Sequence, residues 1–248
     1  MLLFAAAVSA GVMNAVAGGG SFIAFPTLLF TGVPAIPANA TNTVALWTGL
    51  AFSGGAFRRH VNAQGRVLAA LLTASIAGGV IGALLLLRTP AQTFLRVLPW
   101  LMLAATLLFI FGRKLTRPGA SQVVHEAGAK TLFFATCFQF LVAIYGGYFG
   151  GGMGIVILAM LTAFGMADIH EMNALKIVLS TATNGVAVAI FIASRAVYWK
   201  QALVMIAGAA LGGYFGAHYS LRLSQKLVRG FVIAAGAGMT VYFFVRSY

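Results

Sequence analysis

The sequence predicts an all-α integral membrane protein, a polytopic helical bundle of two repeats with about 8–10 membrane segments. Hydrophobic residues make up 61% of the 248 residues and charged residues only 8%, whereas a soluble domain carries about 25% charged residues. No Lys, Arg, Asp or Glu occurs from residue 1 to residue 57, and residues 67–87 form a second uncharged run. Glycine clusters recur in both halves of the chain, which indicates an internal duplication.

Further apolar segments follow along the chain, long enough for helices that cross a bilayer or reach into it. They cover residues 97–112, 131–148, 155–164, 177–194, 202–221 and 231–245. Residues 1–11 lack the basic start of a signal peptide, so we keep them in the fold. We therefore expect a multi-pass protein of the cell membrane, meaning the inner or plasma membrane.

The net charge of +13 arises from 16 Lys and Arg residues against 3 Asp and Glu residues. In a soluble protein this balance would indicate nucleic acid. Here the basic residues gather in short loops near residues 58–66, 113–130 and 222–229, as in membrane proteins that follow the positive-inside rule. We therefore expect membrane lipid as a partner and do not expect nucleic acid. A homodimer is left open.

The residues that could support an enzyme or a cofactor are sparse. Cys137 is the single cysteine, and the four histidines are too far apart in sequence for a metal site. The acids are Glu126, Asp168 and Glu171, and the chain has no HExxH, CxxC or GxSxG motif. We therefore predict no enzyme activity, no metal and no cofactor.

The internal repeat has an offset of 134 residues, which places Gly18 on Gly152, Gly20 on Gly154 and Asn42 on Lys176. The same offset pairs three more glycines, Gly78, Gly79 and Gly82, with Gly212, Gly213 and Gly216. We predict a first repeat over residues 1–112, a basic linker over 113–130 and a second repeat over 131–248. We expect the two repeats to be inverted, although the loop charges are equally compatible with either parity.

Two glycine triplets occupy corresponding places in the repeats: Gly18, Gly19 and Gly20, and Gly150, Gly151 and Gly152. Each glycine destabilises a helix by about 1 kcal/mol relative to alanine, so we expect each triplet to interrupt a helix. A broken helix within a membrane is tolerated inside protein or beside a water-filled cavity, and matched breaks in two halves point to a transporter's binding site. The alternative is close helix packing through small residues.

After each break we expect a short apolar helix, a polar turn at residues 32–37 or 165–170, and a helix starting near residue 38 or 173. Lys176 lies inside the second of these helices, where a cation costs at least about 2.5 kcal/mol and normally faces a cavity or a partner. The alternative is a lysine that extends to the membrane interface. Lys176, Ser180 and Asn184 are spaced to share one helix face.

We predict that these groups bind a small anion. An oxyanion needs several donors in place of its hydration shell, and the amino ends of helices after each break supply free N–H groups and a positive dipole end. The predicted substrate-binding residues are the six triplet glycines together with Lys176, Asn42, Asn184, Thr41, Asn14, Ser180 and Thr183. For a single Ser or Thr, the alternative is a hydrogen bond to its own helix.

The second polar turn also carries Asp168, His170 and Glu171. These residues are candidates for proton coupling, and the alternative is an ordinary solvated turn.

The motif Gly18-Gly-Gly-Ser-Phe-Ile-Ala-Phe-Pro26, followed by Gly32-Val-Pro34 and Ala40-Thr-Asn42, resembles the first half of the TauE/SafE sulfite exporter family. Gly150-Gly-Gly-Met-Gly154, with Lys176 and Asn184, resembles its second half. The resemblance implies export or import of sulfite or organosulfonates. We therefore expect a secondary transporter of a small sulfur-containing oxyanion that works by alternating access. The alternatives are a transporter of another small anion, such as a carboxylate, and a non-transporting membrane assembly protein.

Overall fold

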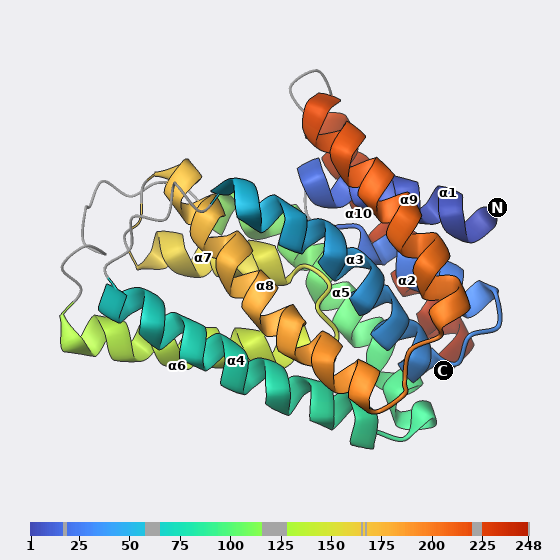
Figure 1. The fold of residues 1–248 in the computed structure, drawn as a ribbon, viewed down its shortest axis with the longest axis horizontal. Helices are drawn as coiled ribbons and strands as arrows, with labels where there is room; N and C mark the ends of the chain where they lie inside the picture. Colours follow the sequence, from blue (N-terminus) through green and yellow to red (C-terminus); the bar gives the residue numbers. More distant parts are fainter. Residues whose placement is uncertain are drawn as a thin grey trace.

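The computed structural model describes residues 1–16, 19–57, 65–115, 128–164, 166, 168–219 and 225–247. Within these residues the fold consists of helices alone (Figure 1). The helices are α1 (Leu2–Val16), α2 (Ser21–Phe30), α3 (Ala35–Phe57), α4 (Gly65–Arg88), α5 (Ala91–Leu115), α6 (Ala129–Tyr148), α7 (Met153–Ala163), α8 (Ile169–Ala193), α9 (Trp199–Tyr219) and α10 (Gln225–Ser247).

The helices have the length and surface of membrane segments. Three of the described ones, in α4, α6 and α8, are long and apolar enough to cross a bilayer, and shorter apolar helices accompany them. Large apolar side chains lie on the outside of the bundle: Phe133 and Phe134 are each 63% exposed and Leu141 is 62% exposed. Such a surface suits hydrocarbon rather than water. The prediction of an all-α membrane bundle is thus confirmed at this level.

Some predicted boundaries differ from the observed ones. The helix α5 continues to Leu115 and α6 begins at Ala129, so both ends of the predicted linker 113–130 belong to helices, and residues 116–127 lie outside the described part. The helix α3 begins at Ala35 instead of residue 38, because Pro37 fits in a first turn whose N–H groups have no helical partner. The helix α8 begins at Ile169 instead of residue 173.

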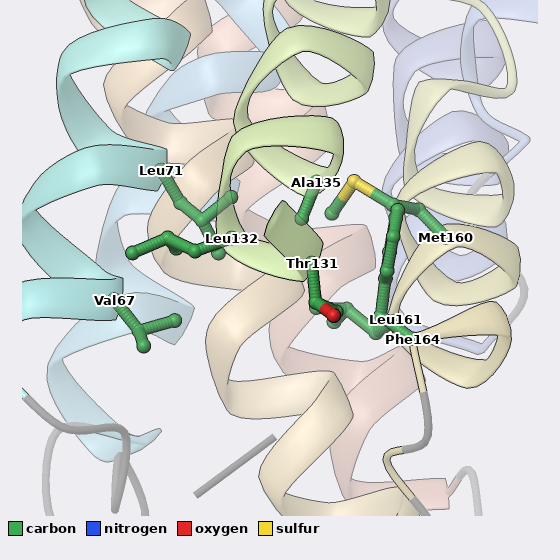
Figure 2. Close-up of a pocket in the computed structure, with 8 residues that line it drawn as sticks. All are labelled: Val67, Leu71, Thr131, Leu132, Ala135, Met160, Leu161 and Phe164. Carbon is green, nitrogen blue, oxygen red and sulfur yellow. The ribbon is translucent and has the colours of Figure 1, made fainter. Parts of the chain in front are cut away.

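A helix ends before each glycine triplet and a short helix begins after it. The helix α7 folds back along α6, so that Leu132 and Ala135 of α6 lie beside Met160 and Leu161 of α7 (Figure 2). With 11 residues, α7 is only about 16 Å long, roughly half the thickness of a bilayer core. The hairpin of α6 and α7 therefore resembles a re-entrant segment.

Small residues bring the long helices into close contact. The helix α4 packs along α6, and α1 packs along α9. A Cβ added at Gly82 would collide with the carbonyl oxygen of Ile144, and one at Gly212 would collide with that of Val8. These glycines thus serve close packing between helices, the role that we expect for Gly78, Gly82, Gly212 and Gly216 outside the triplets.

The centre of the bundle is formed by α3 and α8, which lie side by side and run in opposite directions (Figure 1). Near the start of α3, the hydroxyl of Thr41 accepts a hydrogen bond from the N–H of Tyr198, which follows the end of α8 (3.0 Å). Further along α3, the indole Nε1 of Trp47 donates to the carbonyl oxygen of Thr181 in the middle of α8 (3.0 Å). The connection between α6 and α7 lies against this pair of helices.

Candidate anion-binding site

The second glycine break has a backbone that only glycine adopts readily. Gly150 and Gly152 have φ angles of +77° and +76°, in the left-handed region. The carbonyl oxygen of Tyr145 accepts the N–H groups of Phe149 and Gly150, which ends α6. Gly152 is then the residue before the first turn of α7. The triplet therefore ends one helix and starts another within four residues.

The break leaves several N–H groups without acceptors. The N–H of Met153 donates to Gly150, and that of Ile155 donates to Gly152. Within the described residues, the structure gives no acceptor to the N–H groups of Gly151, Gly152 and Gly154, and no side chain caps the amino end of α7. Gly151 and Gly152 are buried. Buried donors at the positive end of a helix dipole form a site that favours an anion.

Lys176 lies against this amino end. Its Cδ is 3.3 Å from the point where a Cβ on Gly154 would lie, so its alkyl chain passes directly over the first turn of α7. Its Nζ donates to Oδ1 of Asn173, one turn earlier in α8, at 2.9 Å. The side chain is only partly accessible. A lysine charge beside the positive end of a helix is unfavourable by itself, and an anion between them would remove the conflict.

The predicted face of α8 runs along the break. Lys176 lies at Gly154, and eight residues later Oδ1 of Asn184 is 3.7 Å from the Cβ position of Gly150. Ser180 is buried between them on the same face. The structure thus brings Lys176 and Asn184 to the two ends of the break.

Two predicted threonines lie in helix contacts. Thr183 is fully buried beside Gly79 of α4 and Gly146 of α6, and its Oγ1 has no hydrogen-bond partner among the described residues. The hydroxyl of Thr41 is engaged by the N–H of Tyr198 at the start of α9. The structure does not place Thr41 at the second break.

The first break differs from the second. Oδ1 of Asn14 accepts the N–H of Gly20 at 2.9 Å, so this donor is already used inside the protein. Gly20 has an ordinary helical φ of −58°, and it is needed for space because a Cβ there would collide with the carbonyl oxygen of Ala10. Gly19 is buried, and Gly18 lies outside the described residues.

Asn42 faces the start of α2. Its Nδ2 lies 3.3 Å from Oγ of Ser21, the first residue of α2, and its Oδ1 has no hydrogen-bond partner in the described part of the chain. Asn42 therefore lies at the first turn of α2 as Lys176 lies at the first turn of α7. The two residues are on opposite sides of the contact between Trp47 and Thr181, since α3 and α8 are antiparallel. They do not form one cluster.

The acidic turn caps a helix. Asp168 is exposed and directly precedes α8, and its Oδ1 lies 3.4 Å from the N–H of Glu171. An acid before a helix with a Glu three residues later is a capping-box pattern. His170 belongs to the first turn of α8, but its side chain lies outside the described part.

The prediction missed three residues near the second break: Asn39, Asn173 and Tyr145. Nδ2 of Asn39 donates to the carbonyl oxygen of Tyr148 at 2.9 Å, which joins α3 to the end of α6. The hydroxyl of Tyr145 donates to the carbonyl oxygen of Gly151. The repeat offset could have identified the two asparagines, because Asn39 and Asn173 are 134 residues apart.

Two of the cavities among the described residues are not lined by the predicted site residues. One, of about 20 Å³, lies between α4, α6 and α7 and is almost entirely apolar (Figure 2). The other is an open groove of about 500 Å³ between α4 and α6, beside Cys137. The residues at the second break are closely packed in this conformation.

The sequence matches the family model described as Sulfite exporter TauE/SafE over residues 3–243. The chain belongs to the TauE/SafE family. This TauE/SafE chain is 30% identical to a probable membrane transporter protein of a Sinorhizobium species, named ORF9, over 96% of its own length and 90% of the relative's. It is also 30% identical to a probable membrane transporter protein of Haemophilus influenzae, over 96% and 92% of the two lengths.

A third relative, the probable membrane transporter protein YfcA of Escherichia coli, is 28% identical to the TauE/SafE chain over 96% of this chain and 87% of the relative. No solved structure gives a significant match. The family is described as one of sulfite exporters, and these relatives are named as probable membrane transporter proteins. The chain is accordingly a membrane transporter of the TauE/SafE family, located in the cell membrane.

Proposed function

We propose that this protein is a secondary transporter that moves a small sulfur-containing oxyanion, such as sulfite or a sulfonate, by alternating access. The observation that carries the proposal is the second glycine break. Three N–H groups there have no acceptor among the described residues, and Lys176 crosses the first turn of α7 beside one of them. An oxyanion would accept from these donors and would balance the lysine charge.

The chemistry of the site suits a compact anion. An ammonium is a point charge that does not impose the planar, forked geometry of a guanidinium. The backbone donors come from glycines, which have no side chain of their own to cover the N–H groups. Asn184 and the buried Ser180 add polar groups on the same face of α8. The name of the family directs the proposal to sulfur oxyanions.

The helix packing supports the further proposal of two inverted repeats. If α1–α5 correspond to α6–α10, the close pair of α1 and α9 corresponds to the close pair of α6 and α4. The antiparallel pair of α3 and α8 then lies on the axis that relates the repeats. In transporters of this type, one repeat moves against the other around a fixed site. The close packing around Lys176 would then represent an occluded state.

A non-transporting membrane assembly protein is the second candidate, and one observation favours it. Ser180 and Thr183 are buried, and neither cavity is lined by the residues at the second break. A transporter must open such a site to one side and then to the other. Flux measurements therefore separate the two candidates.

The experiment is uptake into proteoliposomes that contain the purified protein, with radiolabelled sulfite, methanesulfonate and acetate as parallel substrates. We expect saturable uptake of sulfite that methanesulfonate inhibits. Preferential uptake of acetate would show that the substrate is a carboxylate and not a sulfur oxyanion. Sulfite binding with no uptake of any anion would favour the assembly protein.

A further inference from the structure

The second break exposes acceptors as well as donors. Each peptide group that leaves a helix presents a carbonyl oxygen, and such an oxygen would repel an anion that the N–H groups attract. The carbonyl oxygens of Gly150 and Gly152 accept N–H groups of α7, and that of Tyr148 accepts from Asn39. The carbonyl of Gly151 is held by a side chain, the hydroxyl of Tyr145.

Tyr145 is well placed for this contact. It lies one turn before the end of α6, and its own carbonyl oxygen accepts the N–H groups of Phe149 and Gly150. Its ring packs against that of Phe149 with 6.3 Å between the centroids, and the side chain contacts both hydrophobic cores. Tyr145 therefore makes two hydrogen-bonded contacts with the break: its carbonyl oxygen binds the start of the break, and its hydroxyl binds Gly151 in the middle.

We propose that Tyr145 is a positioning residue of the anion site, an inference that rests on the proposed function. In a trans peptide the C=O and N–H bonds point in opposite directions. The hydroxyl that holds the Gly151 carbonyl therefore directs the N–H of Gly152, in the same peptide group, away from Tyr145. Gly152 is one of the residues whose N–H has no acceptor within the described part of the chain.

The peptide between Gly151 and Gly152 can reverse easily, because glycine has no Cβ that opposes the change in backbone angles. Without the Tyr145 hydroxyl, the carbonyl oxygen of Gly151 could turn to the side from which an anion approaches. The site would then lose a donor and gain a repulsive oxygen. The alkyl chain and charge of Lys176 would be unaffected, so the change acts on affinity.

The test compares Tyr145→Phe with Tyr148→Phe, its matched control in the same helix. The Tyr148 hydroxyl lies 3.4 Å from Oγ1 of Thr89, which follows α4 and does not belong to the break. Each variant loses one hydroxyl and keeps its ring. We expect Tyr145→Phe to raise KM for radiolabelled sulfite by about tenfold with Vmax retained, and Tyr148→Phe to keep both values. A wild-type KM in Tyr145→Phe, or an equal rise in both variants, would overturn the inference.

Separate controls test whether the variant folds and whether the proposed anion site exists. Size-exclusion elution and the melting temperature in detergent report whether Tyr145→Phe folds. As a second variant, 3-fluorotyrosine at position 145 keeps the ring and is a stronger donor, so we expect KM at or below the wild-type value, and a rise would contradict us. If Lys176→Gln raises KM but Tyr145→Phe does not, only this inference fails. If Lys176→Gln also has the wild-type KM, the proposed anion site itself fails.

Discussion

The indole Nε1 of Trp47 donates a hydrogen bond to the carbonyl oxygen of Thr181, 3.0 Å away and 134 residues further along the chain. The same spacing separates Asn42 from Lys176 and Gly20 from Gly154. Residues at a two-fold axis touch the residues that correspond to them, and Trp47 and Thr181 have the spacing of the proposed repeat. This contact supports the proposal that the repeats are related by an axis between α3 and α8.

Inverted repeats predict opposite membrane sides for Arg66 and Lys200, which begin corresponding helices and are both exposed. In a Cys137→Ser background, we expect Arg66→Cys and Lys200→Cys to react with an impermeant maleimide from opposite sides of oriented membrane vesicles. Labelling of both positions from the same side would exclude inversion and leave repeats of equal orientation.

Because the backbone of Gly152 is left-handed, we expect its substitution by alanine to affect both stability and sulfite binding. An L-residue in that region costs about 1–2 kcal/mol, so Gly152→Ala should lower the melting temperature in detergent and weaken sulfite binding. The control is Gly238→Ala in α10, where an added Cβ meets nothing within 4 Å. We expect no loss in the control. Equal melting temperatures and equal affinities for the two variants would contradict the proposed role of the break.

If Asp168 caps α8, the stability of the protein should depend on its side-chain oxygen more than on its negative charge. Asn is as good a cap as Asp, whereas Ala costs about 1 kcal/mol. We therefore expect Asp168→Ala, but not Asp168→Asn, to lower the melting temperature. We also expect Asp168→Asn combined with Glu171→Gln to keep the pH profile of transport. If this double variant instead loses its pH dependence, the acidic turn couples transport to protons.

The sequence predicted the helical membrane bundle because hydropathy and missing charges are local properties that a bilayer enforces. It also predicted the interruption at each triplet and the face of α8 that carries Lys176 and Asn184, because glycine propensity and helical spacing are local too. It placed the first residues of α3 and α8 too late in the chain. The first turn of a helix tolerates proline and polar residues, and in a sequence these residue types are also typical of a turn.

Contacts between distant residues could not be predicted. Nothing local shows that Thr41 meets Tyr198. Asn14 and Tyr145 lie only six residues from their partners, but helical spacing and glycine propensity do not show that they take the N–H of Gly20 and the carbonyl oxygen of Gly151. The contact of Asn14 uses one donor of the first triplet, the N–H of Gly20. The sequence treated both triplets as equal, whereas among the described residues the N–H of Gly20 has a side-chain acceptor and those of Gly151 and Gly152 have none.

We expect the replacement of Asn42 to change the KM for sulfite less than the replacement of Lys176. Its amide lies at the first turn of α2, on the other side of the crossing of α3 and α8 from Lys176. Asn42→Ala removes one hydrogen bond worth about 1 kcal/mol, so we expect KM for sulfite to rise by less than about tenfold. A rise in KM as large as that of Lys176→Gln would contradict this expectation and indicate that the main anion site lies at the first break.

The most direct test of the anion site is sulfite affinity and flux in Lys176→Gln, with Lys200→Gln as the control. Glutamine keeps donors and nearly the same length but removes the charge, and Lys200 is an exposed lysine at the start of α9. Lys176→Arg should be partly tolerated at best, because a planar guanidinium replaces a compact ammonium. We predict that Lys176→Gln folds but loses at least about tenfold in affinity for sulfite, together with most of the flux, while Lys200→Gln keeps both. Wild-type affinity and flux in Lys176→Gln would contradict the account.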